Sequence, residues 1–93
     1  MVNSSRAIFL DRDGVIIQAP KIKNKPKSIK KLKELRFIHG IIKFCNYYKK
    51  KNFNIIMVTN QPEVTRKKNS KKNILEINNY IKEKLKLRDV FVC

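Results

Sequence analysis

Short, largely apolar runs alternate with longer lysine-rich segments along this chain of 93 residues. Three of these runs, Ala7–Leu10, Phe53–Val58 and Val90–Val92, are bounded by polar or turn-forming residues. An apolar run of four to eight residues predicts a strand that is buried on both faces, as in a parallel sheet. The pattern therefore predicts one strand near each end of the chain and one in the middle.

Two segments between these runs have the period of an amphipathic helix. Their apolar side chains recur every three or four positions, with lysines on the opposite side. Ser70 is the predicted N-cap of the second helix, after a predicted loop from 63 to 69. The residues of the two apolar faces are Ile41, Phe44, Cys45 and Tyr48 in the first helix and Ile74, Ile77, Ile81 and Leu85 in the second. The stretch from 18 to 33 is a predicted loop or flap.

The order strand, helix, strand, helix, strand is typical of an α/β fold with parallel strands and right-handed crossovers. Residues 1–93 form one predicted domain with a modest core. In such sheets ligands bind beyond the carboxyl ends of the strands. Two polar clusters lie at those ends, Asp11-Arg12-Asp13-Gly14 and Thr59-Asn60-Gln61.

The first cluster holds two carboxylates in a strongly basic chain. Asp11 and Asp13 follow a predicted strand directly, and side chains at i and i+2 of an extended backbone point the same way. Neighbouring carboxylates repel, so they bind a cation or share a proton, and Mg²⁺ suits such oxygen ligands. One of them could attack phosphorus while the other acts as general acid and base. The alternative is a pair of turn or capping carboxylates without a catalytic role.

The second cluster adds a hydroxyl at the end of the neighbouring strand. Thr59 and the backbone N–H groups after it could donate to phosphate oxygens. An ordinary strand end followed by turn residues is the alternative for Thr59, Asn60 and Gln61.

The formal net charge of +16 comes mainly from lysine runs. It fits either an acidic partner such as nucleic acid or a solvated lysine-rich surface. The second is favoured, because aromatic residues do not interleave with the lysines and no zinc-finger or helix-turn-helix spacing occurs. No apolar run has the roughly 20 residues of a membrane helix, and the first residues do not form a signal peptide. A cytoplasmic location is therefore expected, where Cys45 and Cys93 form no disulfide framework.

Residues 7–16, AIFLDRDGVI, and 57–61, MVTNQ, resemble the first two motifs of the haloacid dehalogenase (HAD) superfamily. The resemblance is greatest to the branch of histidinol-phosphate and heptose-bisphosphate phosphatases, which residues 37–40 and 52–56 also resemble. It implies the N-terminal half of a Rossmann-type, three-layer HAD fold. It also implies a Mg²⁺-dependent phosphomonoester hydrolase that works through an aspartyl-phosphate.

The same resemblance implies roles for single residues. Asp11 corresponds to the nucleophile and Asp13 to the general acid and base. Mg²⁺ would be held by the Asp11 side chain and the Asp13 backbone carbonyl, and Thr59 would hold the transferring phosphoryl group. The residues expected near the substrate are Arg12, Asn60, Gln61, Pro62 and Arg66.

A sugar phosphate is the expected substrate, namely D-glycero-D-manno-heptose 1,7-bisphosphate with loss of the 7-phosphate. The alternatives are histidinol phosphate, a nucleic-acid 3′-phosphate, or a non-catalytic basic remnant that binds acidic partners. A monomer is expected. Cys93 resembles the first ligand of the family's zinc loop, so Zn²⁺ is expected only in a longer chain, since a zinc site needs about four ligands.

The chain is expected to end before the later motifs of the family. Those motifs supply a basic residue and an acidic pair that completes the magnesium site. The acidic residues after position 62 stand singly: Glu63, Glu76, Glu83 and Asp89. Because phosphoryl transfer depends on positioning and charge stabilisation, weak or no activity and low stability are expected for the 93 residues alone.

Overall fold

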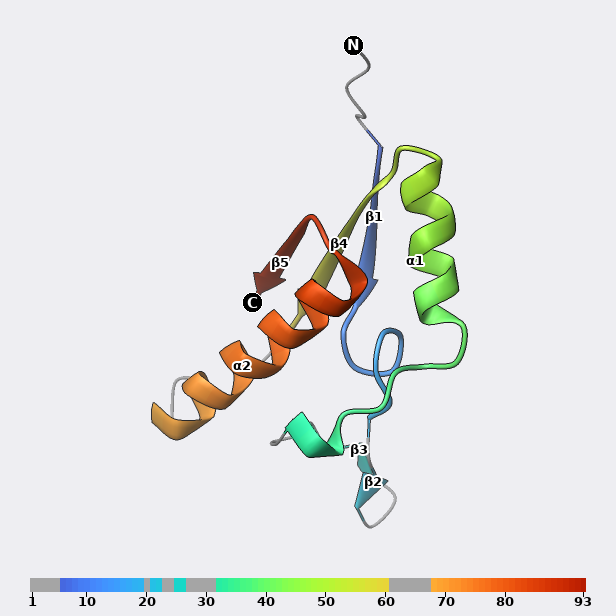
Figure 1. Cartoon of the computed structure of the whole chain (residues 1–93). Helices are drawn as coiled ribbons and strands as arrows, with labels where there is room; N and C mark the ends of the chain where they lie inside the picture. The colour runs from blue at the N-terminus through green and yellow to red at the C-terminus, as the bar shows by residue number, and fades with distance from the viewer. Residues whose placement is uncertain (1–5, 20, 23–24, 27–31, 61–67) are drawn as a thin grey trace.

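The computed structural model describes residues 6–19, 21–22, 25–26, 32–60 and 68–93. These residues form three strands of one sheet, two long helices, a small two-stranded ribbon and a short 3₁₀ helix (Figure 1). In chain order the elements are β1 Ala7–Asp11, β2 Lys21–Ile22, β3 Lys25–Pro26, η1 Leu32–Glu34, α1 Ile41–Lys50, β4 Asn54–Thr59, α2 Lys68–Leu85 and β5 Asp89–Val92.

The main sheet has the order β1-β4-β5, and both pairs of neighbouring strands are parallel. Asp11 at the end of β1 pairs with Val58, and Thr59 at the end of β4 pairs with Val92. The carboxyl ends of the three strands therefore meet at one edge of the sheet. The predicted α/β fold with a parallel sheet is confirmed.

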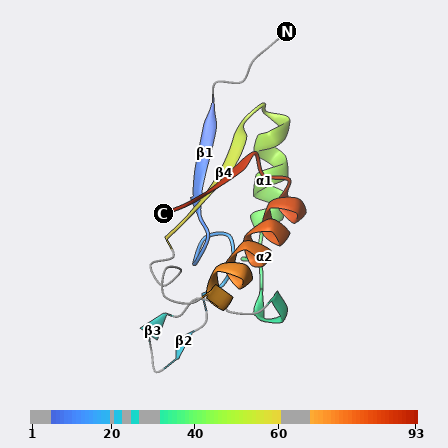
Figure 2. The same cartoon turned by 90° about the vertical axis from the view of Figure 1, so that its left-hand side faces the viewer.

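Both long helices cover the same face of this sheet (Figure 2). From β1 to β4 and from β4 to β5, the chain moves one place in the same direction across the sheet. Right-handed crossovers that advance in one direction place their helices on one side. The prediction that Ala7–Leu10 is a strand buried on both faces is therefore wrong within the described residues. Phe9 is 60% exposed and Phe91 50% exposed, because both side chains lie on the face opposite the helices.

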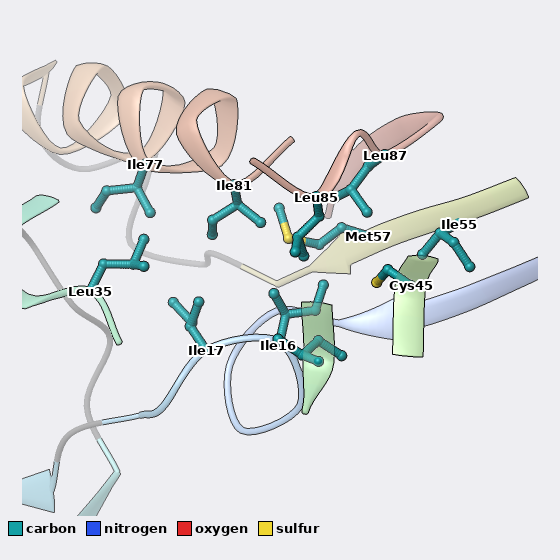
Figure 3. Packing of buried hydrophobic residues seen from close by; sticks show 11 residues of the cluster. Ile16, Ile17, Leu35, Cys45, Ile55, Met57, Ile77, Ile81, Leu85 and Leu87 are labelled. Atoms are coloured by element: carbon teal, nitrogen blue, oxygen red, sulfur yellow. The ribbon is translucent and has the colours of Figure 1, made fainter. Parts of the chain in front are cut away.

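The core lies between the sheet and the helices (Figure 3). Strand alternation points Ile55 and Met57 of β4 toward the helices, and both are buried. The predicted apolar face of α2 joins this core through Ile77, Ile81 and Leu85, and α1 contributes Cys45. The loop after β1 adds Ile16 and Ile17, both fully buried. Packing of this loop into the core fixes the polar cluster that precedes it.

The ends of several elements differ from the predictions. Helix α2 begins at Lys68, so Ser70 lies inside its first turn and is not the N-cap. The predicted loop from 18 to 33 contains β2, β3 and the start of η1. Such short elements have too few residues for a periodic pattern. Among the described residues, no helix is long and apolar enough to cross a membrane.

Candidate active site

The first polar cluster continues the sheet before it turns away. The backbone N–H of Arg12 donates to the carbonyl oxygen of Val58 at 3.0 Å, one residue beyond the end of β1. Asp11 is exposed at this end of the sheet, while Asp13 is partly buried. The expected nucleophile therefore stands at the carboxyl edge, where an α/β sheet binds its ligands.

A tight turn anchors this cluster in the core. The N–H groups of Ile16 and Ile17 both donate to the carbonyl oxygen of Arg12, at 3.1 and 2.9 Å. Gly14 has a φ of 88°, a left-handed conformation that residues with a side chain rarely adopt, and its N–H donates to the Ile17 carbonyl at 2.8 Å. The backbone of Asp13 is thus held between the strand end and two buried isoleucines.

The second polar cluster lies beside the first at the same edge. Thr59 is 3% exposed, and its carbonyl oxygen accepts a hydrogen bond from the N–H of Cys93 at 2.8 Å. Asn60 follows as an exposed residue. The structure therefore brings Asp11, Asp13, Thr59 and Asn60 to one end of the sheet, from positions about fifty residues apart in the sequence. Gln61, Pro62 and Arg66 lie outside the described residues.

Arg12, expected to contact the substrate, points into the protein. Its side chain is fully buried, since strand alternation places it on the helix-covered side together with Leu10. Its Nε donates to Asp13 Oδ1 and its Nη2 to Asp13 Oδ2, both at 3.3 Å. Its Nη1 donates to Asn78 Oδ1 of α2 at 3.0 Å. A guanidinium enclosed in this way orients its neighbours and does not present itself to a substrate, which corrects the expectation for Arg12.

Asn78 was missed in the sequence, although its position carried a signal. It lies four residues after Ile74 and three before Ile81, on the apolar face of α2, and is 3% exposed. An amide within an apolar stripe requires a buried polar partner. That partner is Arg12, which precedes it by 66 residues.

The oxygen atoms at this edge fit part of a magnesium site. Mg²⁺ takes oxygen ligands and commonly uses one or two carboxylates, with water and substrate phosphate completing its shell. The Asp11 carboxylate and the Asp13 carbonyl match that donor type. Within the described part of the chain, no group of three or more His, Cys, Asp or Glu side chains is placed to hold a metal.

Cys93 lies just beyond β5 as an exposed free thiol. A zinc site needs about four ligands, and the described residues place no group of three or more His, Cys, Asp or Glu side chains that could hold a metal. The structure therefore provides no support for zinc at this position.

Comparison with known proteins finds relatives of one kind. The chain is 27% identical over 94 residues to D-glycero-alpha-D-manno-heptose-1,7-bisphosphate 7-phosphatase of Campylobacter jejuni. This match covers 96% of the chain and 51% of the relative. The chain is also 29% identical over 85 residues to D-glycero-beta-D-manno-heptose-1,7-bisphosphate 7-phosphatase of Helicobacter pylori, and this match covers 90% of the chain and 45% of the relative. The chain thus spans about half the length of the curated relatives that it matches. No family model matches it.

A solved structure has the same fold. It is the D,D-heptose 1.7-bisphosphate phosphatase from B. bronchiseptica, complexed with magnesium and phosphate. The likeness has a TM-score of 0.73 at 20% identity and covers 95% of this chain and 49% of that one. The fold class is therefore confirmed, and the match extends over about half of the neighbour's chain.

Proposed function

From this partial relationship to HAD-type heptose-bisphosphate phosphatases, we propose that the chain carries the phosphoryl-transfer half of a phosphomonoester hydrolase site. The observation that supports it is the placement of the DxDG cluster and Thr59 at one carboxyl edge of a parallel sheet. Two relatives over nearly the whole chain are heptose-1,7-bisphosphate 7-phosphatases. A sugar bisphosphate that loses its 7-phosphate is the proposed substrate.

In the proposed reaction a carboxylate oxygen of Asp11 forms a bond to phosphorus while the bond from phosphorus to the sugar oxygen breaks. Asp13 donates a proton to the departing sugar oxygen. Asp13 then accepts a proton from a water molecule that attacks the aspartyl-phosphate, which releases inorganic phosphate and restores Asp11. Thr59 and the N–H groups that follow β4 donate to the phosphoryl oxygens.

Magnesium, when bound by the Asp11 carboxylate and the Asp13 carbonyl, supplies positive charge that offsets the negative charge of the phosphate. Thr59 is proposed to orient the phosphoryl group without binding the metal. Within the described residues no third acidic side chain joins these two groups, so Mg²⁺ would be held weakly and we propose slow turnover for the 93 residues.

Release of phosphate from both anomers of D-glycero-D-manno-heptose 1,7-bisphosphate tests the proposal, with histidinol phosphate and a DNA 3′-phosphate as competing substrates. We expect release from the heptose substrates that needs Mg²⁺ and stops on chelation. Asp11→Asn should abolish it, because an amide is a poor nucleophile. Glu76→Gln is the matched control, since Glu76 is an exposed carboxylate on α2.

Equal rates for Asp11→Asn and Glu76→Gln would refute the proposed nucleophile. Faster hydrolysis of the DNA 3′-phosphate or of histidinol phosphate would refute the substrate. If turnover is too slow to follow, beryllium fluoride, which mimics a carboxyl-bound phosphoryl group, gives a second readout by fluorine NMR. Its failure to bind in the presence of Mg²⁺ would refute the mechanism for this chain.

A further inference from the structure

A fully buried arginine connects the predicted catalytic loop to a helix that carries no predicted catalytic residue. Arg12 contacts Asp13 with Nε and Nη2 and contacts Asn78 with Nη1. The two contacts with Asp13 pair one edge of the planar guanidinium, formed by Nε and Nη2, with the two oxygens of the carboxylate. This geometry fixes the orientation of both groups. The remaining nitrogen, Nη1, contacts α2.

The buried amide of Asn78 by itself lowers the stability of the fold. Its side chain is buried, and Nδ2 has no hydrogen-bond partner within the described residues. A buried amide donor without a partner destabilises a fold, whereas a leucine in an apolar stripe would pack without that cost. The contact of Oδ1 with Arg12 is the gain that offsets the cost.

Arg12 in turn depends on Asn78. A guanidinium taken out of water needs partners for its N–H groups, because a buried charge is tolerated only when paired and hydrogen-bonded. Asp13 covers one side of the fork but is itself 26% exposed, so it can turn toward solvent. The amide of Asn78 is enclosed in the core and holds the other side.

We propose that Asn78 is a positioning residue that acts through Arg12 to hold the Asp13 carboxylate in one rotamer. This inference rests on the proposed function, in which Asp13 is the general acid and base. Proton transfer requires the carboxyl group within hydrogen-bond reach of the leaving oxygen, so a fixed rotamer raises its efficiency. The docking of α2 thereby sets the geometry of a loop that is distant in the sequence.

Asn78→Leu removes the acceptor and keeps the side chain close to its original size. Asn79→Leu is the matched control, because Asn79 is the next residue of α2 and is exposed. Asn78→Asp is the rescue variant, since it keeps an oxygen for Arg12 and replaces the nitrogen that has no described partner. The folding of each variant is checked by the NMR signals of Ile55 and Met57 in the core.

The primary readout is NMR of the isotope-labelled chain and needs no turnover. In the wild type and in Asn79→Leu we expect the three-bond couplings of Asp13 to indicate one rotamer and the guanidinium signals of Arg12 to be separate. In Asn78→Leu we expect averaged Asp13 couplings and merged Arg12 signals, and in Asn78→Asp a return to the wild-type pattern. A folded Asn78→Leu chain that keeps one Asp13 rotamer would overturn the proposal.

Kinetics give the second readout. Asn78→Leu should lower kcat for phosphate release about tenfold with little change in KM, since it disturbs a group that acts in the transition state. A purely structural role would lower stability without this separation of kcat from KM. If the wild type neither releases phosphate nor binds beryllium fluoride with Mg²⁺ while the NMR result stands, the proposed function fails and the positioning pair remains.

Discussion

At the scale of single residues, strand alternation places neighbouring residues of the DxDG motif on opposite sides of the strand, as Arg12 shows. Asp11 is exposed at the end of β1, while Arg12 takes the side on which the helices pack and is buried. Neighbouring residues of one short motif thus face solvent and core. The buried member serves the others by holding Asp13.

Replacement of Arg12 by methionine should lower the free energy of unfolding by about 2 kcal/mol. Loss of one partner from a fully buried ion pair costs more, but Asp13 is partly exposed and water compensates part of the loss. Arg88→Met is the control, because the Arg88 side chain is exposed and its backbone bond to Ile55 survives the change. Urea unfolding of both variants measures the difference, and equal effects would contradict the buried role.

Cys45 provides a residue-level prediction on pH. Burial raises the pKa of its thiol above the ordinary value of 9.0, and the charge of Lys49 lowers it only in part. The folded state therefore keeps the proton where the unfolded state loses it. The stability that this provides is complete below the ordinary pKa and is lost as the pH rises through the raised one.

We expect the free energy of unfolding to fall more steeply between about pH 8 and about pH 10 in the wild type than in Cys45→Val, which has no thiol at this position. Parallel curves for the two proteins would contradict the raised pKa. A thiol reagent at neutral pH offers an independent check. The exposed Cys93 should react quickly and the buried Cys45 slowly.

At the scale of elements, the two helices are tied together at the end of the molecule opposite the predicted site. Lys49 near the end of α1 donates through Nζ to the carbonyl oxygen of Leu85, the last residue of α2, at 2.5 Å. A cation at a helix C-terminus offsets the negative end of the helix dipole. The N–H of Leu87 also bonds the Lys82 carbonyl at 3.0 Å, which closes the end of α2.

That closure places Lys86 at a φ of 52°, in the left-handed region that favours glycine. Lys86→Gly should raise the free energy of unfolding by about 1 kcal/mol, because it removes the steric cost of a side chain in this conformation. Lys84→Gly, two residues earlier and inside the helix, should lower it by about 1 kcal/mol. Thermal unfolding of the two variants gives opposite shifts if the helix ends as described, and shifts of the same sign would contradict it.

At the same scale, the existence of the long elements was predictable and their ends were not. The period of α2 is visible in Ile77, Ile81 and Leu85, all of which are buried. Its start at Lys68 was not predicted, since Ser70 has the chemistry of an N-cap but the helix continues past it. Phe44, predicted for the apolar face of α1, is 38% exposed, whereas Ile41 and Cys45 of that helix are buried.

At the scale of the whole molecule, the described residues build a core on one side of the sheet and leave apolar side chains exposed on the other. Ile55 and Met57 pack under the helices, while Phe9 and Phe91 stand exposed on the other face. Exposed apolar surface of this kind destabilises a small domain in water and favours association.

A pair of substitutions compares the contributions of the two faces of the sheet to stability. Met57→Ala should lower the free energy of unfolding by about 3 kcal/mol, because it leaves a cavity in a core that is fully buried there. Phe9→Thr should change it by less than about 1 kcal/mol, since threonine suits a strand and little packing is lost. It should also reduce self-association in sedimentation experiments. A loss for Phe9→Thr as large as that for Met57→Ala would mean that the second face is covered.

The sequence by itself determined the order of strands and helices, the polar clusters at strand ends and the resemblance to HAD phosphatases. These features depend on local periodicity and on short motifs, which are visible without a partner. The tertiary structure decided which face of the sheet the helices cover, because a strand pattern alone does not say on which side its crossovers pack. It also decided the partner of Arg12, since a contact between residues 12 and 78 exists only once α2 lies against the end of β1.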